Sequence, residues 1–420
     1  MNVRRRGEGP GGEPAASVQI ALWGNFGALN LGNECTLAAA IANLRAQLPH
    51  VTLICVCSRP GDVATRHGIA AIPIASGANG ESLRGSKPLR LLRRLWAEVA
   101  EWIRAWRAMR GVSALLVTGT GILTDHGEGT LGFPYQLFKW CAASRLRGGK
   151  VLYLSVGAES ISQPLSRLFL RNALRMADYR SYRDAHSVAV LRRNGMRTEG
   201  DPIFPDLAFS LALAALPPQA GRGARNAPIV AVGLFNYSVP GPGDADARAA
   251  YEGYLEKICG LIGWLQARGC TVRVIIGDLA YDAAVRSDLR ALLQRRDASL
   301  SVDAFADAPA TSWQELLGQL EPVDFVIASR FHNLVLALLL GKPAISLSYE
   351  PKNEALMQQM RLSEYCQTLD GLDLEQLTDQ FVRLEKNADS LRAAIAAQVL
   401  VNRDRLGQQY HLVAVEVSAT

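Results

Sequence analysis

An arginine and a histidine that could bind and protonate an anion lie two residues apart near position 330. An apolar, β-branched run over residues 323–328 predicts a strand, and residues 333–340 predict a helix directly after Arg330 and His332. A guanidinium offers a planar two-pronged donor to phosphate or carboxylate, and an imidazole can exchange a proton near neutrality. This turn therefore predicts an anion site with acid–base capacity. The alternative is an arginine in a surface ion pair beside a buried histidine.

A second cation follows the next predicted strand of the same half. Residues 344–347 form an apolar run, and Tyr349 and Lys352 come between it and a predicted helix over residues 353–360. The carboxyl ends of neighbouring parallel strands meet at one edge of a sheet, so we expect Lys352 to lie near the Arg330 turn. The alternative is a solvated lysine at the start of a surface helix.

In the first half of the chain, small and charged residues follow another apolar run, residues 114–118. Gly119 and Gly121 come first, and Asp125 and His126 follow them. Glycines at the end of a strand let a ligand approach the backbone, and an acid there can exchange a proton with it. An ordinary glycine turn with a surface histidine explains the same residues equally well.

Two charged residues directly follow the predicted strand at residues 179–182. Arg183 and Asp184 fit an anion site at the same sheet edge. Alternatively, Asp184 or Ser187 caps the next helix and Arg183 pairs with Asp184 at the surface.

The earliest candidate is a loop rich in glycine and asparagine over residues 24–34, between a predicted strand at 18–23 and a predicted helix at 34–48. Glycines allow a positive φ, and the N-terminus of the following helix attracts anions. The spacing fits neither a dinucleotide fingerprint nor a P-loop. The sequence indicates either a ligand-facing loop or a tight turn with Asn33 as N-cap. The candidate residues are Gly24, Asn25, Gly27, Asn30, Asn33 and Glu34.

Apolar β-branched runs alternate with helical patterns along the chain, which is typical of βαβ units and parallel sheets. A stretch rich in proline, glycine and arginine separates two such series. We therefore expect an α/β protein with two Rossmann-like, doubly wound domains facing a cleft. The predicted segments are a disordered leader (1–16), an N-terminal α/β domain (17–215), a linker (216–227), a C-terminal α/β domain (228–372) and a helical tail (373–420).

The composition excludes several other classes of protein. The 420 residues are 49% hydrophobic and 20% charged, which argues against wholesale disorder. No apolar stretch approaches the roughly 20 residues of a membrane-spanning helix. Seven scattered cysteines predict core thiols in a reducing compartment, and their spacing predicts no metal site. A net charge of +6 suits anionic substrates or a membrane surface, whereas nucleic-acid binding is not expected.

A basic amphipathic segment spans Arg84–Arg110. Apolar residues recur in it at helical spacing: Leu92, Leu95, Trp96, Val99, Trp102, Ile103 and Trp106. Basic residues outnumber the acidic Glu98 and Glu101, and they are Arg84, Lys87, Arg90, Arg93, Arg94, Arg104, Arg107 and Arg110. Such a helix can lie on an anionic membrane surface. The alternative is a helix with one face in the core and the other in water.

The order and spacing of these motifs over about residues 18–360 resemble the polysaccharide pyruvyl transferase family. Two positions depart from the family pattern, because Thr120 replaces a glycine and Asn33 replaces an aspartate. The matching segments are the loop 24–34, the turn Gly119–Gly121, Arg183-Asp184 with Ser187, Arg330-Phe331-His332, and Tyr349 with Lys352.

The resemblance implies a GT-B-like architecture and a reaction. The enolpyruvyl group of phosphoenolpyruvate would be moved onto a sugar of a cell-surface or exopolysaccharide precursor, giving a pyruvate ketal. Phosphoenolpyruvate is then a co-substrate, and no cofactor is expected. The residues expected to bind this donor are Arg183, Arg330, His332, Lys352 and Tyr349.

The resemblance also suggests roles in catalysis. His332 would act as the acid beside Arg330, and Asp125 or Asp184 would accept the proton of the sugar hydroxyl. The loop 24–34, with Gly119 and Gly121, would face the acceptor, a sugar or a lipid-linked oligosaccharide. The expected location is the cytoplasm, with peripheral contact at the inner membrane face through Arg84–Arg110.

Two other functions remain open from the sequence. The first is a GT-B glycosyltransferase that uses a nucleotide-sugar, for which Glu350 is the acid nearest the expected sheet edge. The second is a non-catalytic relative that binds an anion or a sugar, which the departures at Thr120 and Asn33 leave open.

Overall fold

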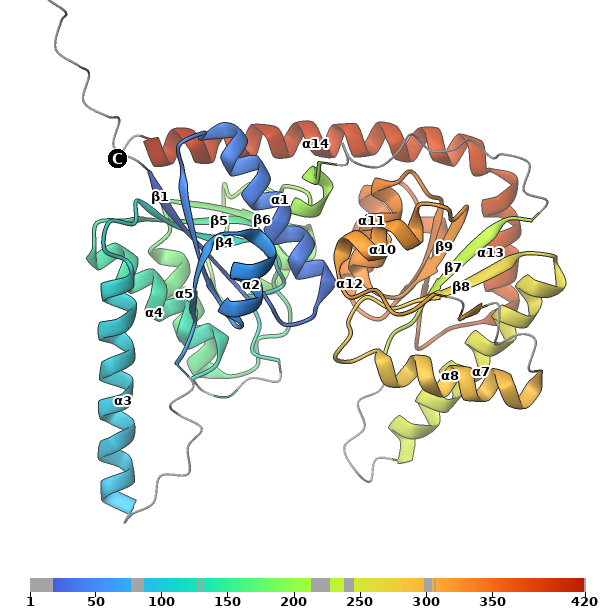
Figure 1. Cartoon of the computed structure of the whole chain (residues 1–420), viewed down its shortest axis with the longest axis horizontal. Helices are drawn as coiled ribbons and strands as arrows, with labels where there is room; N and C mark the ends of the chain where they lie inside the picture. The colour runs from blue at the N-terminus through green and yellow to red at the C-terminus, as the bar shows by residue number, and fades with distance from the viewer. Residues whose placement is uncertain are drawn as a thin grey trace, which may run out of the picture.

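The computed structural model describes residues 18–76, 87–126, 129, 131–212, 227–237, 245–297, 304, 305 and 307–418. Within these ranges the chain forms two parallel sheets, each flanked by helices (Figure 1). The predicted leader, residues 216–226 of the predicted linker and Arg84 of the basic segment lie outside the described residues.

The first sheet has six parallel strands in the order β3-β2-β1-β4-β5-β6. Its central strands are buried along nearly their whole length, as expected for a parallel sheet covered on both faces. The strands are β1 (Gln19–Gly24), β2 (Thr52–Cys57), β3 (Ala70–Pro73), β4 (Ala114–Thr118), β5 (Lys150–Val156) and β6 (Tyr179–Tyr182).

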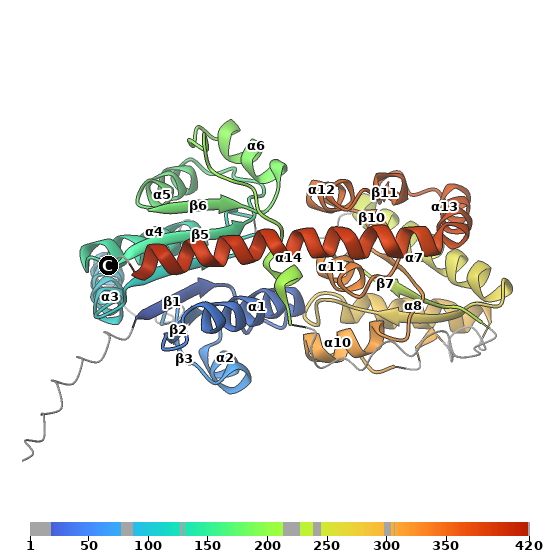
Figure 2. The ribbon, with the colours of Figure 1, turned by 90° about the horizontal axis from the view of Figure 1, so that it is seen from above.

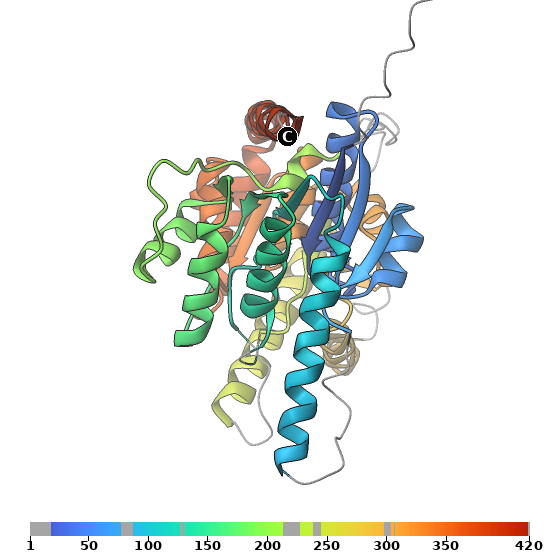
Figure 3. The same cartoon turned by 90° about the vertical axis from the view of Figure 1, so that its left-hand side faces the viewer.

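The helices of this half connect its strands. They are α1 (Leu31–Gln47), α2 (Pro60–His67), α3 (Lys87–Ala108), α4 (Phe133–Leu146), α5 (Pro164–Arg175), α6 (Ala185–Arg193) and the short 3-10 helix η2 (Leu207–Ser210). The N-terminal part of α3 extends beyond α4 and α5, as Figure 3 shows.

The second sheet has five parallel strands in the order β11-β10-β9-β7-β8. The strands are β7 (Ile229–Gly233), β8 (Thr271–Ile275), β9 (Phe325–Ala328), β10 (Ala344–Ser348) and β11 (Cys366–Thr368). The helices are α7 (Ala245–Ala267), α8 (Ala283–Arg296), α10 (Trp313–Leu320), α11 (Phe331–Leu339), α12 (Pro351–Gln359), η3 (Ser363–Tyr365) and α13 (Leu374–Lys386).

The last helix, α14 (Ala388–Ser418), runs along both halves of the molecule (Figure 2). On the second half, the Gln359 amide donates to the Asn402 side chain at 3.1 Å. On the first half, Lys150 Nζ lies 3.0 Å from a Glu416 carboxylate oxygen. The helix is about 46 Å long, at 1.5 Å per residue, and is bonded to both halves.

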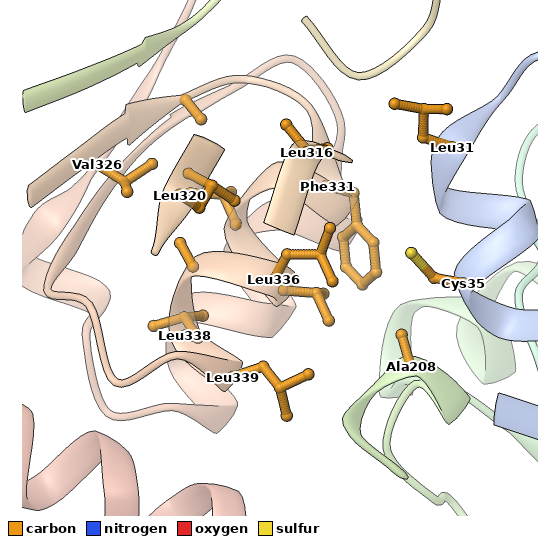
Figure 4. Close-up of a cluster of buried hydrophobic side chains, with 14 of the residues drawn as sticks. Leu31, Cys35, Ala208, Leu316, Leu320, Val326, Phe331, Leu336, Leu338 and Leu339 are labelled. Carbon is orange, nitrogen blue, oxygen red and sulfur yellow. The ribbon is translucent and has the colours of Figure 1, made fainter. Parts of the chain in front are cut away.

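The two halves share one hydrophobic core where they meet. Leu31 and Cys35 of α1 and Ala208 of η2 lie opposite Phe331 of α11 (Figure 4), and all four side chains are buried. Apolar contact at this place holds the two sheets in a defined relation, which any site built from both halves requires.

Candidate functional site

Residues from both halves line a cavity of about 310 Å³, which we call the interdomain cleft. They come from the loops that follow the carboxyl ends of β1, β4, β5, β6, β8, β9 and β10, which is where parallel α/β sheets bind ligands. Its lining includes Asn25, Asn30, Asn33, Thr120, Gly121, His126, Glu159, Arg183, Tyr281, Arg330, His332, Tyr349 and Lys352.

Arg330 lines this cleft, and its guanidinium is fixed by an ion pair with a buried carboxylate. Its Nε and Nη2 donate to the two carboxylate oxygens of Asp282 at 2.8 and 2.6 Å, and the Asp282 side chain is fully buried. Burial alone would lower the pKa of Arg330, yet the bonds and charge of Asp282 raise it above its ordinary value. The guanidinium also lies over the Phe235 ring. Arg330 is therefore a fixed positive charge at the head of α11.

His332 occupies the first turn of α11 and is placed to stay uncharged. Burial, together with the charges of Arg183 and Lys352, lowers its pKa from 6.5 to about 4, and the charge of Asp206 partly opposes this shift. Its Nε2 lies 3.8 Å from an Asp206 oxygen, too far for a hydrogen bond. Within the described part of the chain this nitrogen has no hydrogen-bond partner. His332 therefore lines the cleft with a buried nitrogen whose hydrogen-bonding capacity is unused in the described part of the chain.

Lys352 lies at the start of α12 and is paired across the two halves. Its Nζ is 2.9 Å from Glu159, which follows β5, and it also pairs with Glu350. Burial opposes the charge, but Tyr349, Glu159 and Glu350 raise the pKa of this ammonium above its ordinary value. Both carboxylates are partly exposed, so they can turn to water when another anion approaches Lys352.

Arg183 brings a third cation from the first half. It is buried over the Phe331 ring and lies 3.4 Å from both Asp184 and Asp206. Gly157 makes room for it, because a Cβ there would lie 2.6 Å from Arg183 Nη2. The interdomain cleft thus brings together the five residues that were predicted to bind the donor, which are Arg183, Arg330, His332, Tyr349 and Lys352.

The loop 24–34 folds against the second half. Asn30, rather than Asn33, is the N-cap of α1, and its Nδ2 donates to Asp278 at 3.0 Å. Gly32 lets the start of α1 approach the His332 ring closely, since a Cβ on Gly32 would lie 1.9 Å from His332 Nδ1. The loop's glycines and asparagines therefore let the two halves come together.

Other residues predicted in this loop have internal roles. Glu34 accepts the Gly27 N–H at 2.7 Å and lies 3.2 Å from His67, so it holds the loop's shape. Gly27 itself has a φ of +80°, and a Cβ on Gly24 would meet the Phe26 ring.

The structure does not support the predicted roles of Asp125 and Asp184. Neither carboxylate lines the interdomain cleft. Asp125 is buried and accepts the backbone N–H groups of residues 162 and 163 at 2.7–3.0 Å. Asp184 is the N-cap of α6 and pairs with Arg183. Both are committed to backbone donors, as their positions at a turn and a helix start favour.

Of the two glycines predicted in the turn after β4, one lines the cleft and the other packs in the core. Gly121 lines the cleft, and a Cβ there would lie 2.8 Å from Glu159. Gly119 instead packs against Leu207, because a Cβ on Gly119 would lie only 2.8 Å from the Leu207 side chain.

Sequence reasoning missed the acidic partners of the cleft. Glu159 follows β5 by three residues, Asp278 and Asp282 follow β8, and Asp206 is the N-cap of η2. Their positions after strands were a usable signal. Their partners lie far away in the sequence, however, and only the folded chain reveals them.

The described residues form neither a metal-binding cluster nor a helix that could span a membrane. Among them, no three His, Cys, Asp or Glu side chains gather in a way that would hold a metal ion. None of their helices has the length and apolar character needed to cross a membrane. The cysteines of these ranges are free thiols.

Solved structures share this architecture at low sequence identity. A UDP-GlcNAc 2-epimerase from Neisseria meningitidis bound to UDP-GlcNAc has a TM-score of 0.59 and 12% identity, covering 95% of this chain and 98% of that one. A glycosyltransferase from Rickettsia africae has a TM-score of 0.55 and 10% identity, covering 96% and 98%. MurG from Acinetobacter baumannii has a TM-score of 0.51 and 12% identity, covering 96% and 100%. The predicted two-domain, GT-B-like α/β fold is confirmed.

The family assignment comes from the sequence match. No curated protein sequence matches the chain at a significant level. The family model for polysaccharide pyruvyl transferase, however, matches residues 30–351, from the N-cap of α1 to the start of α12. This range contains every lining residue named above except Asn25 and Lys352, which lie just outside its two ends. The chain therefore belongs to the polysaccharide pyruvyl transferase family.

Proposed function

We propose that the chain transfers the enolpyruvyl group of phosphoenolpyruvate to two hydroxyls of a sugar in a cell-surface or exopolysaccharide precursor. The family supports a transferase of polysaccharide biosynthesis. The observation that carries the choice of donor is the convergence of Arg183, Arg330, Lys352 and His332 in one small cleft.

The cleft has the size and charge for a compact anion. Phosphoenolpyruvate carries a phosphate and a carboxylate on three carbons, and about 310 Å³ is at the small end of ligand pockets. Arg330 is held by the buried Asp282, so it positions one anionic group. Lys352, whose partners are partly exposed, can exchange them for the other.

The reaction needs two proton transfers that the cleft can serve. A proton added to the methylene carbon makes a methyl group and leaves C2 open to attack by one sugar hydroxyl. Phosphate then leaves with a proton, and a second hydroxyl closes the ketal. The two hydroxyls lose two protons, one of which reaches the methyl group and the other the phosphate, so atoms and charge balance.

We assign these transfers to His332 and Glu159. His332 delivers the proton once the donor anion has raised its affinity for protons. Glu159 accepts a hydroxyl proton, because Lys352 and Arg183 lower its pKa against the effect of burial and keep it ionised. Glu159 takes this role in place of Asp125 and Asp184, since it lines the cleft.

The test measures phosphate released from phosphoenolpyruvate in the presence of candidate sugar acceptors. Lys352→Met should abolish release and weaken donor binding at least tenfold, because it removes a buried cation. Lys386→Met, at an exposed position on α13, is the matched control. A thermal-shift assay then compares the stabilisation of the chain by phosphoenolpyruvate with that by nucleotide-sugars, the donors of the alternative function. Stabilisation by nucleotide-sugars, with none by phosphoenolpyruvate, would favour a glycosyltransferase instead.

We further propose that α3 rests on an anionic membrane. Its exposed apolar residues include Trp96 at 72%, Leu91 at 61% and Leu95 at 56%. The C-terminal part of the same helix face holds α3 to the molecule, where Trp102 donates to Tyr135 and Glu98 pairs with Lys139. Figure 1 shows α3 projecting away from α14, and its exposed apolar side chains lie on this projecting helix. Arginines beside exposed tryptophans suit the boundary of an anionic bilayer.

Vesicle flotation tests the membrane proposal. The wild-type chain should float with vesicles of anionic lipid and less with neutral ones, and Trp96→Ser should reduce flotation. Leu400→Ser, at a position on α14 that is 65% exposed, is the control. A wild-type chain that stays in solution with anionic vesicles would refute the proposal.

A further inference from the structure

A second cavity of about 690 Å³ adjoins the interdomain cleft. It lies between the loop 159–162, helices α5 and α6, and the first turn of α12, and we call it the side pocket. Residues His126, Glu159 and Lys352 line both cavities. A molecule in the side pocket can therefore present a group to a molecule in the cleft.

Two arginines give the side pocket a positive charge. Arg167 of α5 and Arg193 of α6 line it, and within the described ranges neither has a carboxylate partner. Arg167 Nη2 donates to the Ser162 carbonyl at 3.0 Å, while its Nε is buried without a partner in the described part of the chain. The Nε–H group of Arg167 is thus shielded from water and keeps an unused capacity to donate a hydrogen bond.

The carboxylates of the side pocket do not cancel this charge. They belong to Glu159 and Glu350, and both pair with Lys352 at the junction with the cleft. The two histidines that line the pocket, His126 and His186, add donors and acceptors without adding a negative charge.

The walls also offer an apolar surface. Ile161 and Val190 are each 7% exposed and lie beside Pro351, which suits the C–H face of a sugar ring. The loop that carries Ile161 is held by Asp125, whose carboxylate accepts the N–H groups of residues 162 and 163. Asp125 therefore shapes this pocket, which gives that buried acid a positioning role.

We infer that the side pocket binds the acceptor sugar through an anionic substituent, a phosphate or a carboxylate, held between Arg167 and Arg193. The sugar ring lies on the apolar wall, and its reacting hydroxyls reach the cleft past Glu159. This inference rests on the proposed function, because the cleft must hold the donor. It also revises the expectation that the loops 24–34 and 119–121 face the acceptor. The interdomain cleft, where we place the donor, is lined by residues of both loops, namely Asn25, Asn30, Asn33 and Gly121.

The experiment measures binding by calorimetry to the full chain with phosphoenolpyruvate present. The probes are galactose 1-phosphate, galacturonate and galactose, which differ in the anionic group. At least one anionic sugar should bind about tenfold more tightly than galactose, and the double variant Arg167→Ala/Arg193→Ala should remove that advantage. Arg175→Ala, an exposed arginine of α5 outside the pocket, is the matched control.

The outcomes separate this inference from the proposed function. If phosphoenolpyruvate does not bind the wild-type chain, the proposed function fails. If it binds but the anionic sugars bind no better than galactose, or the double variant keeps their advantage, the side pocket is not the acceptor site. A double variant that loses affinity for phosphoenolpyruvate itself would also overturn the inference, because the pocket would then belong to the donor.

Discussion

The charge of His332 should depend on whether a donor anion lies in the cleft. Burial, together with Arg183 and Lys352, lowers the pKa of this ring from 6.5 to about 4 in the structure. At pH 7 about one molecule in a thousand then carries a proton on the ring, and charging it costs about 4 kcal/mol. An acid in this state would be too rarely charged to protonate a substrate.

A bound donor should reverse most of this shift. One uncompensated negative charge about 5 Å from the ring contributes about 3 kcal/mol at an effective dielectric constant of about 20. This corresponds to about two pKa units, which restores a value near that of an ordinary histidine. The donor would thus create the acid that its own reaction needs.

Nuclear magnetic resonance can follow this change directly. The chain has six histidines, and His332→Gln identifies the signal of this ring during a pH titration. We expect a pKa of about 4 in the protein alone and a rise of about two units with saturating phosphoenolpyruvate and no acceptor. A value near 6.5 in the protein alone would refute the burial argument. An unchanged value with the donor bound would refute the placement of the donor.

Two further variants test contacts around the cleft. Gly32→Ala puts a methyl group where the His332 ring lies, so its melting temperature should fall below that of Gly61→Ala, whose position is open. Equal melting temperatures would contradict this close approach. Asp125→Asn weakens the bonds to the 162–163 N–H groups and should cost about 1–3 kcal/mol in urea unfolding at pH 7. These bonds lower the pKa of Asp125, so the deficit should shrink as the pH falls below about 4, and a constant deficit would contradict the assignment.

The positions of the cations could be predicted because they depend on local pattern. Arg330 and Lys352 each follow a short apolar run that is typical of a buried strand, and parallel strands bring their carboxyl ends to one edge. The start of α11 was predicted two residues late, since Phe331 and His332 belong to the helix. Such an error at a helix boundary does not move the site.

The anionic side of the site could not be predicted in this way. Arg330 pairs with Asp282 across 48 positions, and Lys352 pairs with Glu159 across 193. Nothing local distinguishes those carboxylates from Asp125, which also follows a strand but bonds to the backbone. Only the packing of the two halves decides which acid faces a cation and which holds a loop.

The long helix α14 limits how the two halves can move. It is bonded to the second half through Asn402 and to the first through Glu416, and the buried Gln409 also bonds to the Ser155 hydroxyl. Drawing the halves straight apart would have to bend the helix or detach one end. A twist about its long axis strains it far less. The contacts of α14 therefore favour rotation of the two halves about the axis of this helix over their separation.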